Sequence, residues 1–320
     1  MDRLTFLIRS MSGFAAGAAM TSSTAVADDF PSRPITLIVP WGPGGGADQM
    51  GRAVAAVMQE SLKSATVPVV NVPGADGNDG IVKLVEGDAD GYTIAVLVSD
   101  TFYGNMTSKT APPWQLKDIV PLAVMNRQPL TFFAAKSGAY KSWKEIEAAS
   151  KRTPVKIAID GFGSAEDVLT KYLAAKGVKL VPIPYAKPGE RYAALLGNQV
   201  DLMCEPDGNV RRYIAAGQIR PVIVFSSKRV PEIDDAPTAA ELGHNIALAE
   251  WRSIVVKAGT DPEKIRFLSD ALARVDKSSE YRKFLKDTWS DADSYVSYKD
   301  LPAYLRTKSQ EMQNLLLASR

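Results

Sequence analysis

Histidine and cysteine are almost missing from this sequence. The 320-residue chain has one cysteine, Cys204, and one histidine, His244. A single cysteine cannot form an internal disulfide, and a zinc site needs three or four Cys, His or carboxylate ligands. Catalysis by a Ser-His-Asp or Cys-His arrangement would depend on His244 alone, which lies in the turn-like stretch 242–245. We therefore interpret both residues as structural, and we predict no metal, no cofactor and no enzymatic activity.

An excess of one charge and long apolar runs are lacking too. Lys and Arg number 38 and Asp and Glu number 36, which gives a formal net charge of +2. This balance predicts no broad positive face and no nucleic-acid partner. Beyond the N-terminal segment, no stretch approaches the roughly 20 apolar residues that cross a bilayer. With 46% hydrophobic and 23% charged residues, the composition is typical of a soluble globular protein.

The N-terminal segment has the pattern of a secretory signal. Arg3 and Arg9 flank an apolar stretch that ends in small residues, with Ala25–Ala27 just before two aspartates. A positive start, a short apolar region and an A-x-A site are typical of a cleaved signal peptide. The alternative is a membrane anchor, which the polar interruptions at Arg9 and 21–24 disfavour. We predict a signal peptide at residues 1–27 and an exported protein.

The remaining chain alternates short apolar runs with amphipathic stretches. Residues 35–39, 67–72 and 92–98 read as buried strands, and 48–62 carries apolar residues at helical spacing. This alternation predicts an α/β fold in which helices flank a mostly parallel sheet.

The same pattern recurs between residues 155 and 225, and a chain of this length usually forms two domains. Short strands are predicted at 120–124 and 130–134, where the chain crosses over. After one more strand the sequence is mostly helical from 262 onward, as if it returned to the first unit. We predict lobe 1 at 28–127 plus 253–320, and lobe 2 at 128–252.

A glycine-rich loop between a strand and a helix is the most informative segment. It runs from Trp41 to Asp48 and includes Gly44, Gly45, Gly46 and Ala47. Glycines let a ligand approach bare N–H groups, and the start of the following helix attracts anions such as carboxylates. The alternative is a tight turn in which Asp48 caps its own helix. The pattern alone leaves both interpretations open.

A second loop of this kind follows the strand at 155–159. Here Phe162, Gly163, Ser164 and Ala165 open a helix, and Ser164 offers a hydroxyl group. The alternative is again a cap, because Ser164 followed by Asp167 is close to a capping box. Two such loops, one in each predicted lobe, are what a ligand clamp needs.

Two other patterns in this region point elsewhere. Gly42-x-Gly44-x-x-Ala47 matches a loose dinucleotide fingerprint, but the next strand, which ends at Val72, has Asn71 in place of the acidic residue that would bind the ribose. The stretch 76–80 hints at a calcium loop, although its spacing is wrong and no closing Glu follows. A secreted hydrolase using Ser164 is a further alternative, but no general base is evident for it.

Several ordered segments together resemble the substrate-binding receptors of tripartite tricarboxylate transporters, the Bug family. They are spread over nearly all of the chain after residue 30: 31–40, Gly44-Gly45-x-x-Asp48, Arg52, 71–77, 89–93, 161–164, 184–185, 195–201, 216–220, 237–238 and 251–259. Each segment is weak singly, and their order and spacing carry the resemblance.

The resemblance implies a two-lobed periplasmic-binding-protein fold of the Venus flytrap kind, type II-like, with a small organic carboxylate between the lobes. It also implies a periplasmic monomer that works with one large and one small membrane permease subunit. The loop from Trp41 to Asp48 would bind one carboxylate, and residues 162–165 would bind from the second lobe. We further expect ligand contacts from Ser99, Thr101, Tyr185 and Glu205.

Three places depart from the family pattern. The turn after Tyr185 reads 186–190 instead of a Lys-Gly-Gly type turn, Cys204 and Glu205 replace a common aromatic-Asp pair, and Glu166 stands where a neutral polar residue or His is frequent. Acidic groups near the cleft would disfavour a second carboxylate on the ligand or receive a cationic group. If they face solvent, they say nothing about the ligand.

Overall fold

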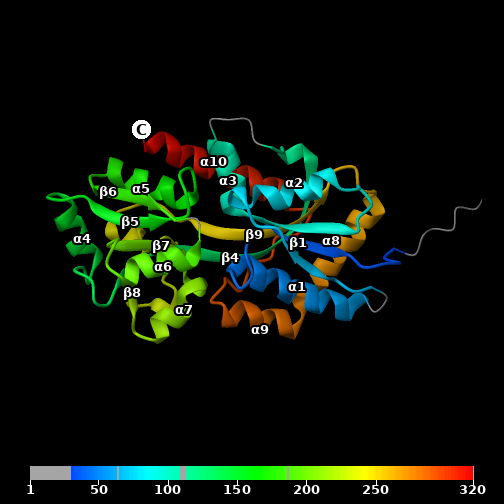
Figure 1. The fold of residues 1–320 in the computed structure, drawn as a ribbon, viewed down its shortest axis with the longest axis horizontal. Helices are drawn as coiled ribbons and strands as arrows, with labels where there is room; N and C mark the ends of the chain where they lie inside the picture. Colours follow the sequence, from blue (N-terminus) through cyan, green and yellow to red (C-terminus); the bar gives the residue numbers. More distant parts are fainter. Residues whose placement is uncertain (1–29, 63–64, 109–112, 186, 320) are drawn as a thin grey trace, which may run out of the picture.

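The computed structural model describes residues 30–62, 65–108, 113–185 and 187–319. Over these ranges the chain forms two α/β lobes side by side (Figure 1). The predicted signal peptide, residues 1–27, lies outside the described residues. None of the helices in the described part of the chain has the length and apolar character that a bilayer crossing requires.

The first lobe is built on one end of a mixed sheet. Its strand order is β2-β1-β3-β9-β4, with β1 parallel to β2 and β3, and β9 antiparallel to β3 and β4. The bounds of these strands are β1 Thr36–Val39, β2 Val69–Asn71, β3 Thr93–Val98, β4 Ile119–Ala135 and β9 Ala249–Lys257.

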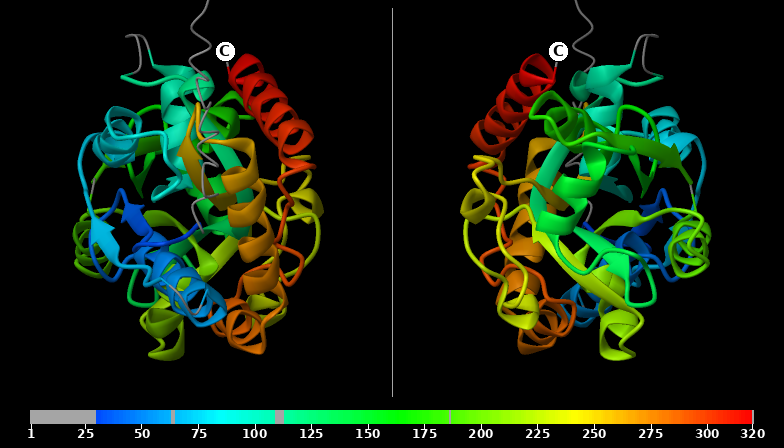
Figure 2. Two further views of the ribbon diagram at one scale, coloured as in Figure 1. Left: turned by 90° about the vertical axis from the view of Figure 1, so that its right-hand side faces the viewer. Right: turned by 90° about the vertical axis from the view of Figure 1, so that its left-hand side faces the viewer.

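Helices cover both faces of this part of the sheet (Figure 2). Successive residues of β3 face opposite sides of the sheet. Ala95 belongs to one apolar core and Val96 to another, and both side chains are fully buried. Burial on both faces explains the continuous apolar runs in the sequence. The helices are α1 Gly46–Leu62, α2 Asn78–Glu86, α3 Ser99–Thr107, α8 Pro262–Lys277 and α9 Ser279–Asp287.

The second lobe continues the sheet through the far half of β4. There β4 pairs with β7 and β8, and β7 leads on to β5 and β6. The strands are β5 Val155–Ile159, β6 Leu180–Pro184, β7 Leu202–Pro206 and β8 Ile219–Val224. The helices are α4 Trp143–Ser150, α5 Ala165–Ala175, α6 Pro188–Leu196 and α7 Asp207–Ala215. Single 3₁₀ turns lie at Ala75–Gly77, Leu116–Asp118, Pro231–Ile233 and Ala240–Leu242. The predicted two-lobed α/β fold class is confirmed.

Strands β4 and β9 join the two lobes. β4 pairs with β9 from Ile119 to Pro129 and with β7 from Leu130 onward. The sequence predicted two separate strands here, and the structure has a single one of 17 residues. The prolines within it lack an N–H group. The pairing shifts register next to Pro121, so that the strand continues past this proline.

The lobe boundaries near 127 and 252 fall inside these continuous strands, and the division itself stays a prediction. The last helix, α10 (Leu301–Ala318), packs against α5 of the second lobe as well as β4 (Figure 1). It therefore extends beyond the lobe to which residues 253–320 were assigned.

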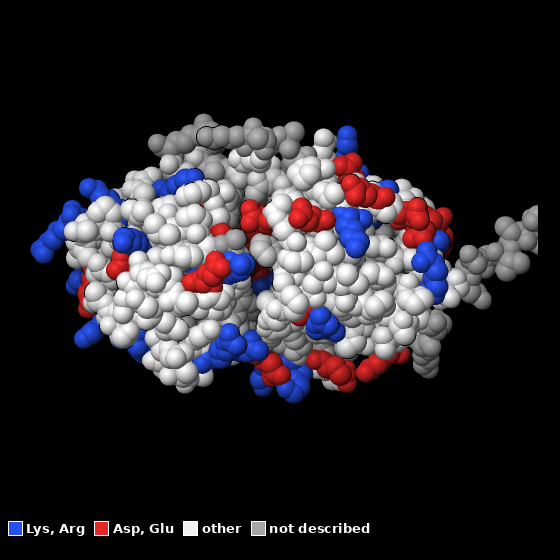
Figure 3. Space-filling view, viewed as in Figure 1, with Lys and Arg blue, Asp and Glu red and all other residues white. Residues whose placement is uncertain are grey.

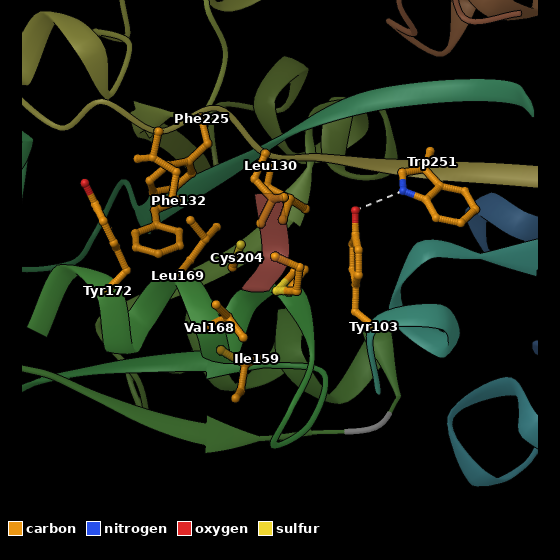
Figure 4. Close-up of a cluster of buried hydrophobic side chains, with 14 of the residues drawn as sticks. Tyr103, Leu130, Phe132, Ile159, Val168, Leu169, Tyr172, Cys204, Phe225 and Trp251 are labelled. Carbon is orange, nitrogen blue, oxygen red and sulfur yellow. Dashed lines mark hydrogen bonds between the residues drawn. The ribbon is translucent and has the colours of Figure 1, made fainter. Parts of the chain in front are cut away.

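The two chemically unusual residues have structural surroundings. Cys204 is fully buried among apolar side chains of the second lobe, including Leu130 and Val168 (Figure 4). His244 lies edge-on to Trp143, with its Nε2 3.5 Å from Glu147 Oε1. Both arrangements agree with the structural roles expected from the sequence.

Candidate functional site

A cleft of about 650 Å³ lies between the two lobes. Figure 3 shows it as a narrow hollow with acidic and basic side chains along its rim. It is lined from the first lobe and the joining strand by Trp41–Ala47, Gln49, Val98, Asp100, Glu250 and Arg252, and from the second lobe by Asp160, Glu166, Lys187–Gly189, Arg191, Tyr192, Glu205, Pro206, Asn209, Arg211 and Arg212.

The glycine-rich loop and the start of α1 form the first-lobe wall of this cleft. Gly44 has a φ of +82°, a conformation that favours glycine. A Cβ atom added at Gly46 would lie 2.4 Å from Arg252 Nη2 and 2.6 Å from Asn209 Oδ1. Glycine therefore lets the start of α1 approach α7 of the opposite lobe without a shift of these two side chains. The first N–H groups of α1 have no partner within the helix, so they can donate to an anion in the cleft.

Asp48 supports this loop from behind. Its Oδ2 accepts hydrogen bonds from Gly44 N at 2.9 Å and Arg52 Nε at 3.0 Å, and its Oδ1 accepts one from Asn71 Nδ2 at 2.9 Å. Burial raises the pKa of Asp48, but these bonds outweigh it and the pKa lies below its usual value. Asn71 also donates to the carbonyl of Trp41. The side chain of Asp48 braces the loop and is not among the residues that line the cleft.

The second-lobe loop has a similar internal brace. Gly163, with φ of +91°, donates its N–H to Asp167 Oδ2 at 2.8 Å, and the hydroxyl of Ser164 caps α5 by accepting from Asp167 N. Phe162 is 70% exposed. Ser164 therefore forms the hydrogen bond of a helix cap, as the alternative interpretation predicted. In this structure residues 162–165 lie beside the cleft wall, and the next residue, Glu166, lines it.

The other predicted ligand residues also have protein partners. Ser99 Oγ accepts from Trp251 N, and Thr101 Oγ1 donates to the carbonyl of Asp76. The carbonyl of Tyr185 accepts from Arg191. Ligand contact by these residues stays a prediction. Of the predicted set, the cleft is lined by Trp41, Gly44, Gly45, Gly46, Ala47 and Glu205.

Two buried arginines line the cleft, and the sequence did not indicate either of them. Arg191, 4% exposed, donates from Nε and Nη2 to Glu205 Oε1 at 2.8 and 2.5 Å, and it forms an ion pair with Asp160. Burial alone would lower the pKa of Arg191, but Glu205 and Asp160 raise it well above its usual value.

The second arginine lies in β9. Arg252 donates from Nη1 to Asn126 Oδ1 at 2.7 Å and to Gln128 Oε1 at 2.9 Å, and its Nη2 pairs with Glu250. Burial raises the pKa of Glu250, while Arg252 opposes this rise. Most of the donors of both arginines are therefore already engaged by protein groups.

Three further carboxyl groups meet across the cleft. One oxygen each of Asp100, Asp160 and Glu166 lies within 4.8 Å of those of the other two. Burial is the main reason why the pKa of each is raised. Glu166 and Glu250 raise the pKa values of Asp100 and Asp160 further, to well above their usual value. The pKa of Glu166 rises to about 7, although Arg191 and Ser164 oppose the rise. This group has oxygen ligands of the type that hard metal ions prefer, but Ca²⁺ usually takes six to eight of them.

The sequence could have indicated only part of this group. Asp100 is the second residue after a buried strand and Asp160 directly follows another, which is where ligand-binding residues of α/β sheets gather. Arg191 and Arg252 lie inside a helix and a strand, and nothing local distinguishes them from solvent-exposed charges.

The sequence comparisons identify the family. The family model described as "Tripartite tricarboxylate transporter family receptor" matches residues 50–316. The chain belongs to this receptor family. Protein BugT of Bordetella pertussis is 31% identical over 272 residues, which cover 83% of each protein.

Solved structures agree with this assignment. The periplasmic binding protein BugD is similar with a TM-score of 0.81 and 26% identity, over 90% of this chain and 98% of that one. An R. palustris protein solved with adipate has a TM-score of 0.84 at 22% identity, over 91% of this chain and 98% of that one, and it shows the shared fold. Receptors of this family are solute-binding proteins, and membership implies a periplasmic location.

Proposed function

We propose that this protein is a periplasmic receptor that closes its two lobes on a small organic carboxylate and delivers it to a large and a small permease subunit. The proposal includes removal of residues 1–27 as a signal peptide, action as a monomer and no catalysis. The observation that carries it is the glycine loop with the start of α1, which presents N–H groups to the cleft and touches the opposite lobe through Gly46.

The strength of such a site is sufficient for a receptor. A hydrogen bond to a charged group contributes about 1.5–3 kcal/mol, and a micromolar dissociation constant corresponds to about −8 kcal/mol. Four or five bonds to one carboxylate reach this value after the costs of ordering the ligand and closing the lobes. The R. palustris relative in fold binds adipate, a carboxylate of a size that such a cleft can hold.

The hydrolase alternative finds no support in the geometry. The hydroxyl of Ser164 accepts from Asp167 N as a helix cap, and His244 packs on Trp143. A nucleophile needs a general base within hydrogen-bond reach. The carboxyl group of Glu166 does hydrogen-bond to Ser164, but the Ser164 hydroxyl already serves as the cap of α5.

A thermal-shift screen of the protein purified from the periplasm tests the proposal. At 100 times its dissociation constant, a ligand stabilises a protein by about 2.7 kcal/mol. We expect one class of organic carboxylates to raise the melting temperature, and nucleotides to leave it unchanged. Stabilisation by nucleotides alone would contradict the proposal.

The variant Gly46→Ala tests the position of the site. The added methyl group would meet the side chains of Arg252 and Asn209, which must shift before the two lobes can come this close, so carboxylate binding should fall about tenfold. Gly104→Ala is the matched control, because a Cβ atom there meets nothing within 4 Å. Equal affinities of the two variants would exclude the loop as part of the site.

A further inference from the structure

The carboxyl cluster of Asp100, Asp160 and Glu166 draws its members from both lobes. Asp100 lies in the first turn of α3, Asp160 directly follows β5, and Glu166 lies in the first turn of α5. All three line the cleft, and one oxygen of each lies within 4.8 Å of the other two. A group bound by all three would connect the lobes directly.

The protein balances the charge of this cluster only in part. Arg191 pairs with Glu205 and Asp160, and Arg252 pairs with Glu250. Within the described residues, neither Asp100 nor Glu166 forms an ion pair with a basic side chain. The cleft also has basic residues at its rim, but Lys187 is 80% exposed there and pairs with Glu190.

Glu166 carries an independent sign of a missing partner. Its side chain is 2% exposed, and its Oε2 atom is buried without a hydrogen-bond partner although the residue lines the cleft. Buried polar atoms without partners are rare in folded proteins because each costs the free energy of its lost hydration. An oxygen of this kind at a ligand site indicates that the ligand supplies a donor.

We propose that this cluster binds the ammonium group of the ligand, and that the ligand is an amino carboxylate whose carboxylate binds at the glycine loop. This inference rests on the proposed receptor function. An ammonium group donates three hydrogen bonds in tetrahedral directions, and acceptors about 2.8 Å from its nitrogen lie about 4.6 Å apart. The carboxyl oxygens lie within 4.8 Å of one another, a limit that this arrangement satisfies.

Charge separates this ligand from a dicarboxylate. A second carboxylate at the cluster would face three acidic groups in a buried site, where repulsion between like charges is strong. An ammonium group meets the unpartnered oxygen of Glu166 and attracts both lobes, so it also favours closure.

Binding should therefore depend on pH in a definite direction. The groups that face Glu166 are Asp100 from α3, Asp160 after β5, and Glu205, Arg191 and Glu250 from β7, α6 and β9. The ammonium group binds the ionised carboxylates, so the complex releases protons, and affinity should rise between about pH 5 and pH 8.

Calorimetric titration with matched ligands tests the inference. The series are butyrate, pentanoate and hexanoate; succinate, glutarate and adipate; and aspartate, glutamate, 4-aminobutyrate and 5-aminopentanoate, with putrescine as a diamine. We expect at least one amino carboxylate to bind at least tenfold tighter than the dicarboxylate of the same chain length, with affinity that rises with pH.

The other outcomes separate the two proposals. Tighter binding of dicarboxylates would overturn the ammonium site and leave the carboxylate receptor intact. Binding of putrescine as tight as that of amino carboxylates would support the cluster and contradict the carboxylate receptor. Absence of binding in every series would overturn both.

Variants of the cluster test whether it binds the ammonium group. Glu166→Gln and Asp160→Asn should each weaken amino carboxylate binding about 10- to 100-fold, the loss expected for one charge-assisted hydrogen bond. Glu60→Gln, on the exposed side of α1, should change nothing. Unchanged affinity in both cluster variants would overturn the inference. Stabilisation by CaCl₂ alone that Glu166→Gln abolishes would also overturn it, because the cluster would then bind a metal ion.

Discussion

Replacement of Glu166 by Gln should stabilise the ligand-free protein at alkaline pH. Burial raises the pKa of Glu166 from 4.5 to about 7; Arg191 and Ser164 oppose this rise, and Glu205 and Glu250 add to it. A carboxyl group with a raised pKa binds its proton more tightly in the folded state than in the unfolded chain. Its contribution is neutral below about pH 4.5, becomes steadily more unfavourable between pH 4.5 and about 7 while only the unfolded chain ionises, and stays constant above that.

The size of the effect follows from the shift in pKa. At 1.36 kcal/mol per unit, ionised Glu166 costs about 3 kcal/mol at pH 8 relative to pH 4. Glu166→Gln removes this cost, so its melting temperature should exceed that of the wild type by roughly 6 °C at pH 8 and by little at pH 4.5.

Differential scanning calorimetry of the ligand-free protein from pH 4.5 to 8 measures this difference. Glu60→Gln is the control, since its side chain is exposed and its replacement should have the same small effect at every pH. A Glu166→Gln protein that is less stable than the wild type at pH 8 would refute the reasoning, because Glu166 would then be held by a favourable partner.

Three further outcomes are expected. Gly208→Ala should destabilise the protein by about 2 kcal/mol or more in urea unfolding, because the new Cβ atom would lie 1.9 Å from the carbonyl oxygen of Thr288; wild-type stability would mean that the contact yields. Arg191→Met should lower the free energy of unfolding by about 3–5 kcal/mol in the same assay, because Glu205 is left buried without Arg191. A loss below about 1 kcal/mol would contradict the pairing. Cys204 should resist thiol reagents until the protein unfolds, because it is fully buried and burial raises the pKa of its thiol; rapid labelling of the folded protein would contradict this.

The alternation of strands and helices could be predicted because buried positions require apolar residues, and their spacing differs between strands and helices. Strand β3 is apolar on both faces, and α1 places Met50, Val54 and Met58 on one buried stripe. The single strand β4 was read as two because Pro121 and Pro129 usually interrupt strands. Helix α3 was missed because it begins in polar residues right after a strand, and its apolar residues cluster in the middle.

The site was predictable only where one loop carries it. The Trp41–Ala47 loop lines the cleft as its glycines indicated, whereas the carboxylate of Asp48 turned out to bind Gly44 within the same loop. The grouping of charged residues in the cleft could not be predicted. Asp100, Asp160 and Glu250 are far apart in the sequence and converge only when β9 joins the lobes. Among the charged groups of the cleft, Glu166 and Glu205 stood out in the sequence through their departure from the family pattern.

Native mass spectrometry of the protein, purified from the periplasm and offered a mixture of organic acids, amino acids and nucleotides, tests the central claim most directly. We expect a single chain that lacks residues 1–27 and retains one small molecule, which fragmentation shows to contain a carboxylate. Retention only of molecules without a carboxylate, or of none at millimolar concentration, would contradict it.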